Sequence, residues 1–172
     1  MKTKIQLLLP AILLMTAFAF AGKYVANEFG FAASFPADVG HTQITPDVNS
    51  FVANGPGGAW VAQVKVTKNV AMPEKITKEF MEGKLAEVLK GGFMTQTGSS
   101  SYTTVQGNPA VLATATFIIN NRNTNLVSYS AVADMKLIFV KSQNRVYWVA
   151  GWAIQGQDRS GIQQFLDSFE LR

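Results

Sequence analysis

The chain has 172 residues, including 15 lysines and arginines, 11 aspartates and glutamates, one histidine and no cysteine. This composition excludes a disulfide framework, a thiolate metal site, a cysteine nucleophile and a histidine-rich metal centre. A 48% apolar share with 15% charged residues is typical of one folded domain rather than of a disordered chain.

Residues 1–21 are predicted to be a signal peptide. Lys2 and Lys4 precede an almost wholly apolar stretch that ends in small residues, which signal peptidase requires at its cleavage site. We expect cleavage after Ala21, with Ala19 as the alternative. The other interpretation is an uncleaved anchor helix, but the stretch is shorter than the ~20 residues that a bilayer span needs.

Cleavage predicts an exported protein, periplasmic or extracellular, with a single globular domain over residues 22–172. Loss of Lys2 and Lys4 lowers the net charge from +4 to +2. The remaining basic residues are scattered rather than interleaved with aromatic ones, so no nucleic-acid partner is expected. A lipoprotein is excluded because no cysteine can carry the lipid, and we expect a soluble chain without stable membrane insertion.

Alternating side chains predict the strands of the first half. Aromatic and small residues alternate along residues 29–36, and Pro36 ends that strand because it has no N–H to donate. Residues 48–54 and 60–67 are two further predicted strands. The glycine-rich segment at 55–58 is expected to form the turn between them.

A switch to helical spacing predicts a helix over residues 77–91. Its apolar side chains recur three and four positions apart and form one stripe, while lysines and glutamates occupy the rest of the surface. Thr77 is expected to cap the first turn, and Gly91 to end the helix in the left-handed conformation. The stripe is typical of a helix that packs against a sheet.

The second half is rich in β-prone residues. The predicted strands are residues 102–105, 110–119, 126–133, 135–141 and 145–154, with a polar loop at 120–125. Asp134 separates two of these strands and is interpreted as a strand break or bulge. Both faces of residues 145–154 are apolar, which indicates a central strand covered on both sides.

The chain ends in a second predicted helix, residues 160–169, with the most regular apolar spacing in the sequence. Ser160 and Gln163 have the spacing of a capping box. The order of elements predicts an α+β fold with about six or seven strands and two main helices, 77–91 and 160–169.

Three tryptophans are the candidate ligand-binding residues. The indole rings of Trp60, Trp148 and Trp152 offer flat faces that stack on a sugar or line an apolar pocket. Trp148 and Trp152 are four residues apart on one predicted strand and therefore point to the same side. The alternative interpretation is core packing beneath a helix.

The sequence offers little for catalysis. His41 is the only imidazole and lies in a predicted polar loop, and no spacing of serine and acid residues selects partners for it. Asp134 is the other candidate for a hydrolase, because it interrupts an apolar stretch. No calcium-binding loop and no phosphate-binding loop is present, so no metal or cofactor is expected.

Four segments carry a family resemblance, in order along the chain. They are GFAASFP at residues 30–36, VQGNPA at 105–110, NRVYWV at 144–149 and FLDSFEL at 165–171. Together they resemble the opening strand, a strand entry, a later strand and the closing helix of bacterial secreted PsbP-like proteins. The resemblance implies an α/β/α sandwich around a mainly antiparallel sheet. It carries over no functional residue, because relatives such as the PsbP subunit of photosystem II and the Ran-binding Mog-type proteins share no catalytic centre.

The expected function is therefore that of an exported, non-enzymatic accessory or binding protein of the cell envelope, whose partner is an envelope protein or a small ligand. The alternative is a carrier of a small apolar or saccharide ligand in a pocket lined by tryptophan. A hydrolase that uses Asp134 or His41 is the third possibility.

Overall fold

A computed structural model describes residues 22–120 and 128–172. The predicted signal peptide, residues 1–21, lies outside the described residues, as does most of the polar loop predicted at 120–125. Within the described ranges, none of the helices has the length and apolar character needed to cross a bilayer.

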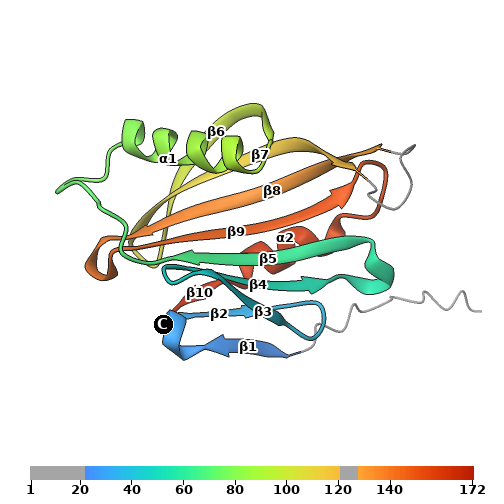
Figure 1. The fold of residues 1–172 in the computed structure, drawn as a ribbon, viewed down its shortest axis with the longest axis horizontal. Coiled ribbons are helices and arrows are strands. Elements are labelled where there is room, and N and C mark those ends of the chain that lie inside the picture. Colours follow the sequence, from blue (N-terminus) through green and yellow to red (C-terminus); the bar gives the residue numbers. More distant parts are fainter. Residues whose placement is uncertain (1–21, 121–127) are drawn as a thin grey trace, which may run out of the picture.

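The centre of the molecule is a seven-stranded sheet in which every pair of neighbours is antiparallel (Figure 1). Its spatial order is β3 (Gly40–Thr45), β4 (Val48–Asn54), β5 (Trp60–Thr67), β9 (Arg145–Ile154), β8 (Ser128–Val140), β7 (Asn108–Asn120) and β6 (Thr95–Val105). β9 lies in the middle, between β5 and β8. The two-sided apolar pattern of residues 145–154 is thus explained, and the predicted central strand is confirmed.

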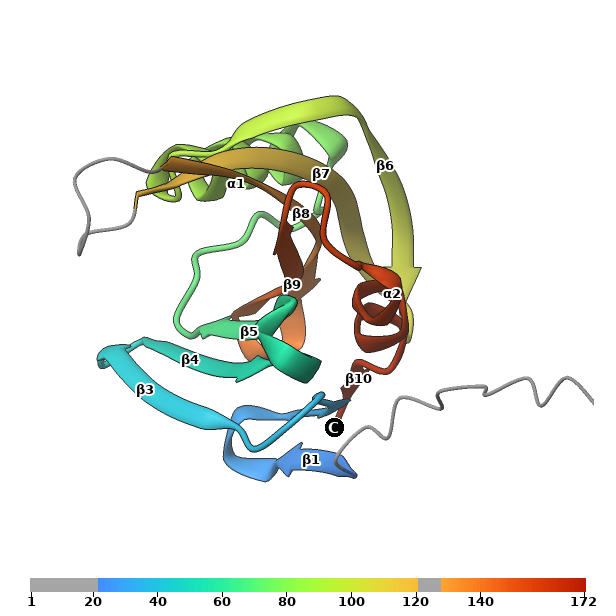
Figure 2. The ribbon, with the colours of Figure 1, turned by 90° about the vertical axis from the view of Figure 1, so that its right-hand side faces the viewer.

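Different elements cover the two faces of this sheet (Figure 2). Helix α1 (Lys78–Gly91) buries Met81, Leu85 and Leu89 against one face, chiefly over β6 and β7. Helix α2 (Ser160–Asp167) and a small sheet of β1 (Lys23–Ala26), β2 (Phe31–Ser34) and β10 (Glu170–Leu171) pack on the other. The predicted α+β sandwich with two main helices and a mainly antiparallel sheet is confirmed.

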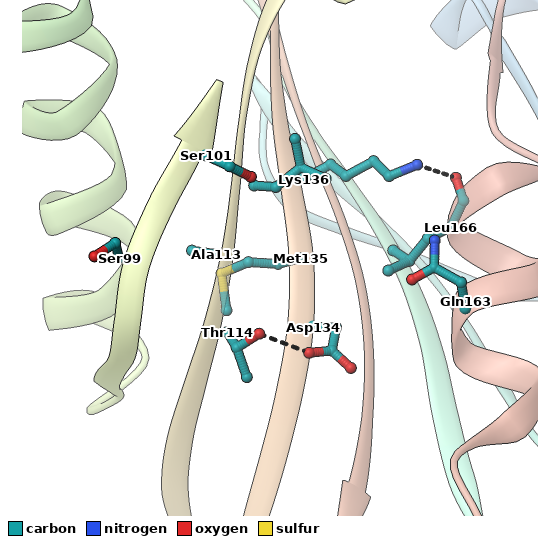
Figure 3. A pocket seen from close by; sticks show the side chains of 10 residues that line it. Ser99, Ser101, Ala113, Thr114, Asp134, Met135, Lys136, Gln163 and Leu166 are labelled. Carbon is teal, nitrogen blue, oxygen red and sulfur yellow. Dashed lines mark hydrogen bonds between the residues drawn. The ribbon is translucent and has the colours of Figure 1, made fainter. Parts of the chain in front are cut away.

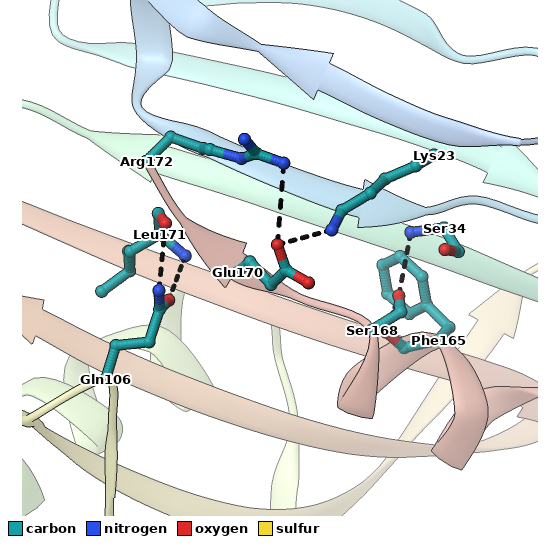
Figure 4. Close-up of polar contacts among 8 residues, drawn as sticks. All are labelled: Lys23, Ser34, Gln106, Phe165, Ser168, Glu170, Leu171 and Arg172. Atoms are coloured by element: carbon teal, nitrogen blue, oxygen red, sulfur yellow. Dashed lines mark hydrogen bonds and ion pairs between the residues drawn. The ribbon is translucent and has the colours of Figure 1, made fainter.

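The end of the chain is tied to both sheets by polar contacts (Figure 4). The Ser168 hydroxyl accepts a hydrogen bond from the Ser34 amide at 2.9 Å, and Lys23 pairs with Glu170 at 2.5 Å. The Gln106 side chain donates to the Leu171 carbonyl at 3.2 Å and accepts from its amide at 2.5 Å. These contacts hold β10 as the third strand of the small sheet.

Several predicted boundaries are wrong. The strand at residues 29–36 starts only at Phe31, because residues 27–29 form a 3₁₀ turn that Gly30 closes at φ +71°. Residues 40–45 form β3 rather than a polar loop. The strand predicted at 102–105 is the end of the longer β6.

The interpretation of Asp134 as a strand break or bulge is also wrong. Asp134 lies inside the continuous strand β8, opposite Thr114 on one side and Gly151 on the other, in unbroken register. A carboxylate is tolerated there because its two oxygens accept hydrogen bonds from Thr114 and Arg159. The two strands predicted on either side of it are therefore one.

One of the three predicted helix-capping interactions is confirmed, and two are wrong. Thr77 caps α1 as expected, by accepting a hydrogen bond from the Phe80 amide at 3.3 Å. Gly91 is still helical, however, and it is Phe93 that takes the left-handed conformation, at φ +51°. The start of α2 is held by Asp158, which accepts from the Ser160 amide and hydroxyl, and not by the predicted capping box.

Candidate functional site

Trp60 is a core residue beneath α2. It is 4% exposed and packs in the cluster that joins the large sheet to α2 and the small sheet. A Cβ atom added at Gly161 would lie 2.5 Å from its ring carbon Cζ2, and one added at Gly55 would lie 2.4 Å from its Nε1. Since glycines are needed for the ring to fit, Trp60 is placed for packing.

Trp148 and Trp152 lie on the opposite face of the sheet from Trp60. Both project from β9 toward the side that α1 partly covers, and both are partly buried. Trp152 packs edge-to-face on Phe117, with ring centroids 5.5 Å apart. The structure therefore brings two of the three predicted tryptophans to one side, as their spacing indicated, and separates Trp60 from them.

Trp148 lines a cavity of about 290 Å³. The cavity lies beside the end of α1, because this helix packs mainly over β6 and β7 and leaves the face over β5 and β9 less covered. Its walls come from three places, the end of α1, the segment that follows it, and strands β5 and β9. The lining residues are Lys65, Thr67, Glu87, Val88, Gly91, Gly92, Met94, Val146 and Trp148.

The cavity has an apolar wall and a polar rim. Val88, Met94, Val146 and Trp148 supply the apolar surface, and the Trp148 Nε1–H is directed at the Met135 sulfur, 3.4 Å away. The indole N–H is thus held by a weak acceptor inside the core. A cavity wall in which an aromatic ring is bordered by aliphatic side chains is typical of a small-molecule site.

The two charged groups on the rim differ in their pairing. Glu87 accepts two contacts from the Lys84 ammonium, at 3.0 and 2.8 Å, so its charge is balanced within α1. Lys65 is partly buried and has no hydrogen bond, ion pair or ring contact with any residue of the described ranges. The cavity consequently carries an unbalanced positive charge.

A second, smaller cavity of about 170 Å³ lies on the other face, between β6, β7, β8 and α2 (Figure 3). It is polar, lined in part by Ser99, Ser101 and Thr114, and it contains the charged residues Asp134 and Lys136. Asp134 accepts from the Thr114 hydroxyl at 2.8 Å and forms an ion pair with Arg159.

The Lys136 ammonium is also bound by partners within the protein. It donates to the Leu166 carbonyl and to Asp167, each at 3.0 Å, and so ties β8 to α2. A hydrogen bond from Gln163 and the nearby Lys136 ammonium hold the pKa of Asp167 below its ordinary value. The charges in this cavity are therefore matched by protein partners, and a ligand would have to displace them.

His41 lies on the edge strand β3, in an aromatic cluster. Its ring stacks on Phe51 with centroids 4.5 Å apart and planes at 3°, and Phe29 meets it edge-on at 5.3 Å. Its Nε2 is 3.0 Å from Oδ1 of the buried Asn49. No serine or carboxylate is hydrogen-bonded to His41 in the described part of the chain, and the exposed ring rests on the aromatic side chains of the core.

The cavity residues other than Trp148 were not predicted from the sequence. Val88 belongs to the apolar stripe of α1, and Met94 follows the helix, so both have the pattern of core residues. Lys65 is the one informative signal, because it is the single charged residue within β5. Its position beside Trp148 depends on strand pairing, which the sequence does not specify.

Comparisons with known proteins identify the fold and no family. No protein-family model matches the chain, and no curated protein matches it. A crystal structure from Bacteroides thetaiotaomicron VPI-5482 is similar at a TM-score of 0.53 and 12% sequence identity, over 90% of this chain and 49% of that one. This chain thus spans about half the length of that protein, and the likeness is one of fold alone.

Proposed function

We propose that this protein is a non-enzymatic binding protein of the cell envelope, which holds a small apolar or saccharide ligand against Trp148. The observation that carries the proposal is the cavity of about 290 Å³ beside that ring. This volume is at the lower end of the ~300–1,000 Å³ usual for small-molecule pockets, so it suits a ligand of one or two rings.

Burial of the Trp148 ring supports binding through apolar contact. The indole is partly buried, and a ligand that covers its remaining surface would remove apolar area from water. The wall behind it is formed by fully packed residues such as Met135, at 1% exposure, so the pocket does not need to be built on binding. A preformed pocket loses little free energy to ordering.

The state of the two catalytic candidates supports a role in binding rather than in catalysis. His41 stacks on Phe51 and meets Phe29 edge-on, and Asp134 is paired with Arg159 and accepts a hydrogen bond from Thr114. A general base needs a free lone pair directed at substrate, and a nucleophile needs an adjacent base. Within the described residues His41 has no serine or carboxylate partner, and both oxygens of Asp134 accept from Thr114 and Arg159.

Tryptophan fluorescence tests the proposal. The full chain lacking its predicted signal peptide is titrated with a panel of small aromatic, fatty and saccharide compounds, in parallel with thermal unfolding. We expect at least one compound to change the emission and raise Tm, and Trp148→Leu to abolish both effects. A panel without any response in emission or Tm would contradict the proposal.

Trp152→Phe is the matched control. Trp152 lies on the same strand and the same face as Trp148, but it packs on Phe117 and does not line the cavity. We expect the Trp152→Phe variant to bind the same compound with unchanged affinity. Equal loss of binding in both variants would point to a general disturbance of β9 rather than to a site at Trp148.

A further inference from the structure

Lys65 is the direct register partner of Trp148. The two residues face each other across the pairing of β5 with β9, and both line the same cavity. Side chains opposite each other on antiparallel strands have Cβ atoms ~4.5–5.5 Å apart. A ligand that covers the Trp148 ring must therefore lie within reach of the Lys65 ammonium.

The ammonium has no counter-charge within the described residues. Its other strand neighbour is Ser50, whose hydroxyl accepts a hydrogen bond from Gln63 at 2.8 Å. The one carboxylate on the cavity rim, Glu87, is already paired with Lys84. A partly buried cation costs free energy unless an anion or hydrogen-bond acceptor approaches it.

We infer that the ligand is a small amphipathic carboxylate, with its apolar part on Trp148 and its carboxylate on the Lys65 ammonium. This inference rests on the proposed function of the same cavity. The Thr67 hydroxyl lies two residues along the same face of β5 and lines the cavity as well, so it is placed to donate to the second carboxylate oxygen. Charge-assisted hydrogen bonds of this kind are stronger than neutral ones and select anions over neutral analogues.

Three probes of one shape separate the charge from the apolar contact. They are 3-phenylpropanoate, 3-phenylpropan-1-ol and 3-phenylpropylammonium, titrated by isothermal calorimetry at low ionic strength. We expect the carboxylate to bind about tenfold more tightly than the alcohol, and the ammonium compound to bind most weakly. Added salt should weaken binding of the carboxylate and leave that of the alcohol nearly unchanged.

Variants of Lys65 assign the preference to one residue. Lys65→Met should weaken binding of 3-phenylpropanoate about tenfold, to the level of the alcohol, while Lys65→Arg keeps the charge and retains the preference. Lys90→Met is the matched control, because it removes the same charge from an exposed position on α1 that does not line the cavity. It should leave the affinity unchanged.

The outcomes distinguish this inference from the proposed function. If the alcohol binds as tightly as the carboxylate, or if Lys65→Met and Lys90→Met have the same effect, the role of Lys65 is overturned while the cavity remains a binding site. If none of the three probes binds the wild-type chain, the inference is overturned, whereas the small-ligand function of the Trp148 cavity is overturned only if the wider compound panel also leaves emission and Tm unchanged. Circular dichroism of Lys65→Met and Lys65→Arg establishes that each variant is folded.

Discussion

Trp60 and Trp148 lie on neighbouring strands of one sheet, yet their rings are on opposite faces of it. Trp60 is paired with Ala153, and Ala153 and Trp148 are an odd number of residues apart on β9. Because side chains alternate between the faces of a strand, that odd separation places the two indoles on opposite sides. One ring is thereby assigned to the core beneath α2 and the other to a cavity.

Replacement of Trp60 should lower the stability of the fold without changing ligand binding at the Trp148 cavity. Trp60→Ala removes a ring that is 4% exposed and packed against Phe165, so we expect a loss of about 3–5 kcal/mol in the free energy of unfolding. Urea denaturation measures this loss. Trp148→Leu should cost less, because its ring is only partly buried. A Trp60→Ala variant as stable as the wild type would contradict the packing role.

Glycine substitutions should have opposite effects in the two helices. Gly83 is an exposed residue inside α1, and an added Cβ would meet no atom within 4 Å, so Gly83→Ala should stabilise by about 0.5–1 kcal/mol. Gly161→Ala should destabilise by about 1–3 kcal/mol, since its Cβ would lie 2.5 Å from Trp60. Thermal unfolding of both variants checks the prediction, and a lower Tm for Gly83→Ala would contradict it.

Asp158 should titrate below the ordinary range of an aspartate. Hydrogen bonds from the Ser160 amide, and then from its hydroxyl, lower the pKa of this carboxyl in the folded state. Its contribution to stability is therefore present above the unfolded-state pKa of ~3.9 and is lost as the pH falls through the folded-state value. A carbon NMR titration of the carboxyl measures the folded-state pKa directly. A midpoint at or above ~3.9 would contradict the capping role.

Export remains a prediction, and it has a direct test. The apolar stretch before Ala21 predicts that the secreted chain begins at Gly22, with cleavage after Ala19 as the alternative. Mass spectrometry of the intact chain from periplasm and medium distinguishes these two products from the uncleaved one. Recovery of only the uncleaved chain, in the membrane fraction, would support an anchor instead.

The spacing of apolar residues was sufficient to predict the helices and strands that bury at least one face. β5 was predicted because its side chains alternate between buried and partly buried environments, β9 because both its faces are apolar, and α1 because its stripe covers the sheet. β1, β3 and β10 were not predicted. All six residues of β3 are exposed and β10 has two residues, so backbone pairing holds these strands without an apolar pattern.

The candidate site was predictable only in part, for a geometrical reason. The spacing of four residues along one strand correctly predicted that Trp148 and Trp152 lie on the same face of the sheet. Partners on different strands depend on register, as with Lys65 and Trp148, and on long-range pairing, as with Asp134 and Arg159. Membership of the PsbP-like group likewise stays a prediction, because a fold likeness at 12% identity does not test it.

The cavity at Trp148 is tested most directly by the indole N–H signals in a proton–nitrogen NMR spectrum of the chain labelled with nitrogen-15. Three tryptophans give three such signals, and single variants assign them. On titration with 3-phenylpropanoate, we predict that the Trp148 signal shifts in a saturable manner while the Trp60 signal stays in place. Saturable movement of the Trp60 signal with a fixed Trp148 signal, or no movement of any of the three, would contradict a binding site at Trp148.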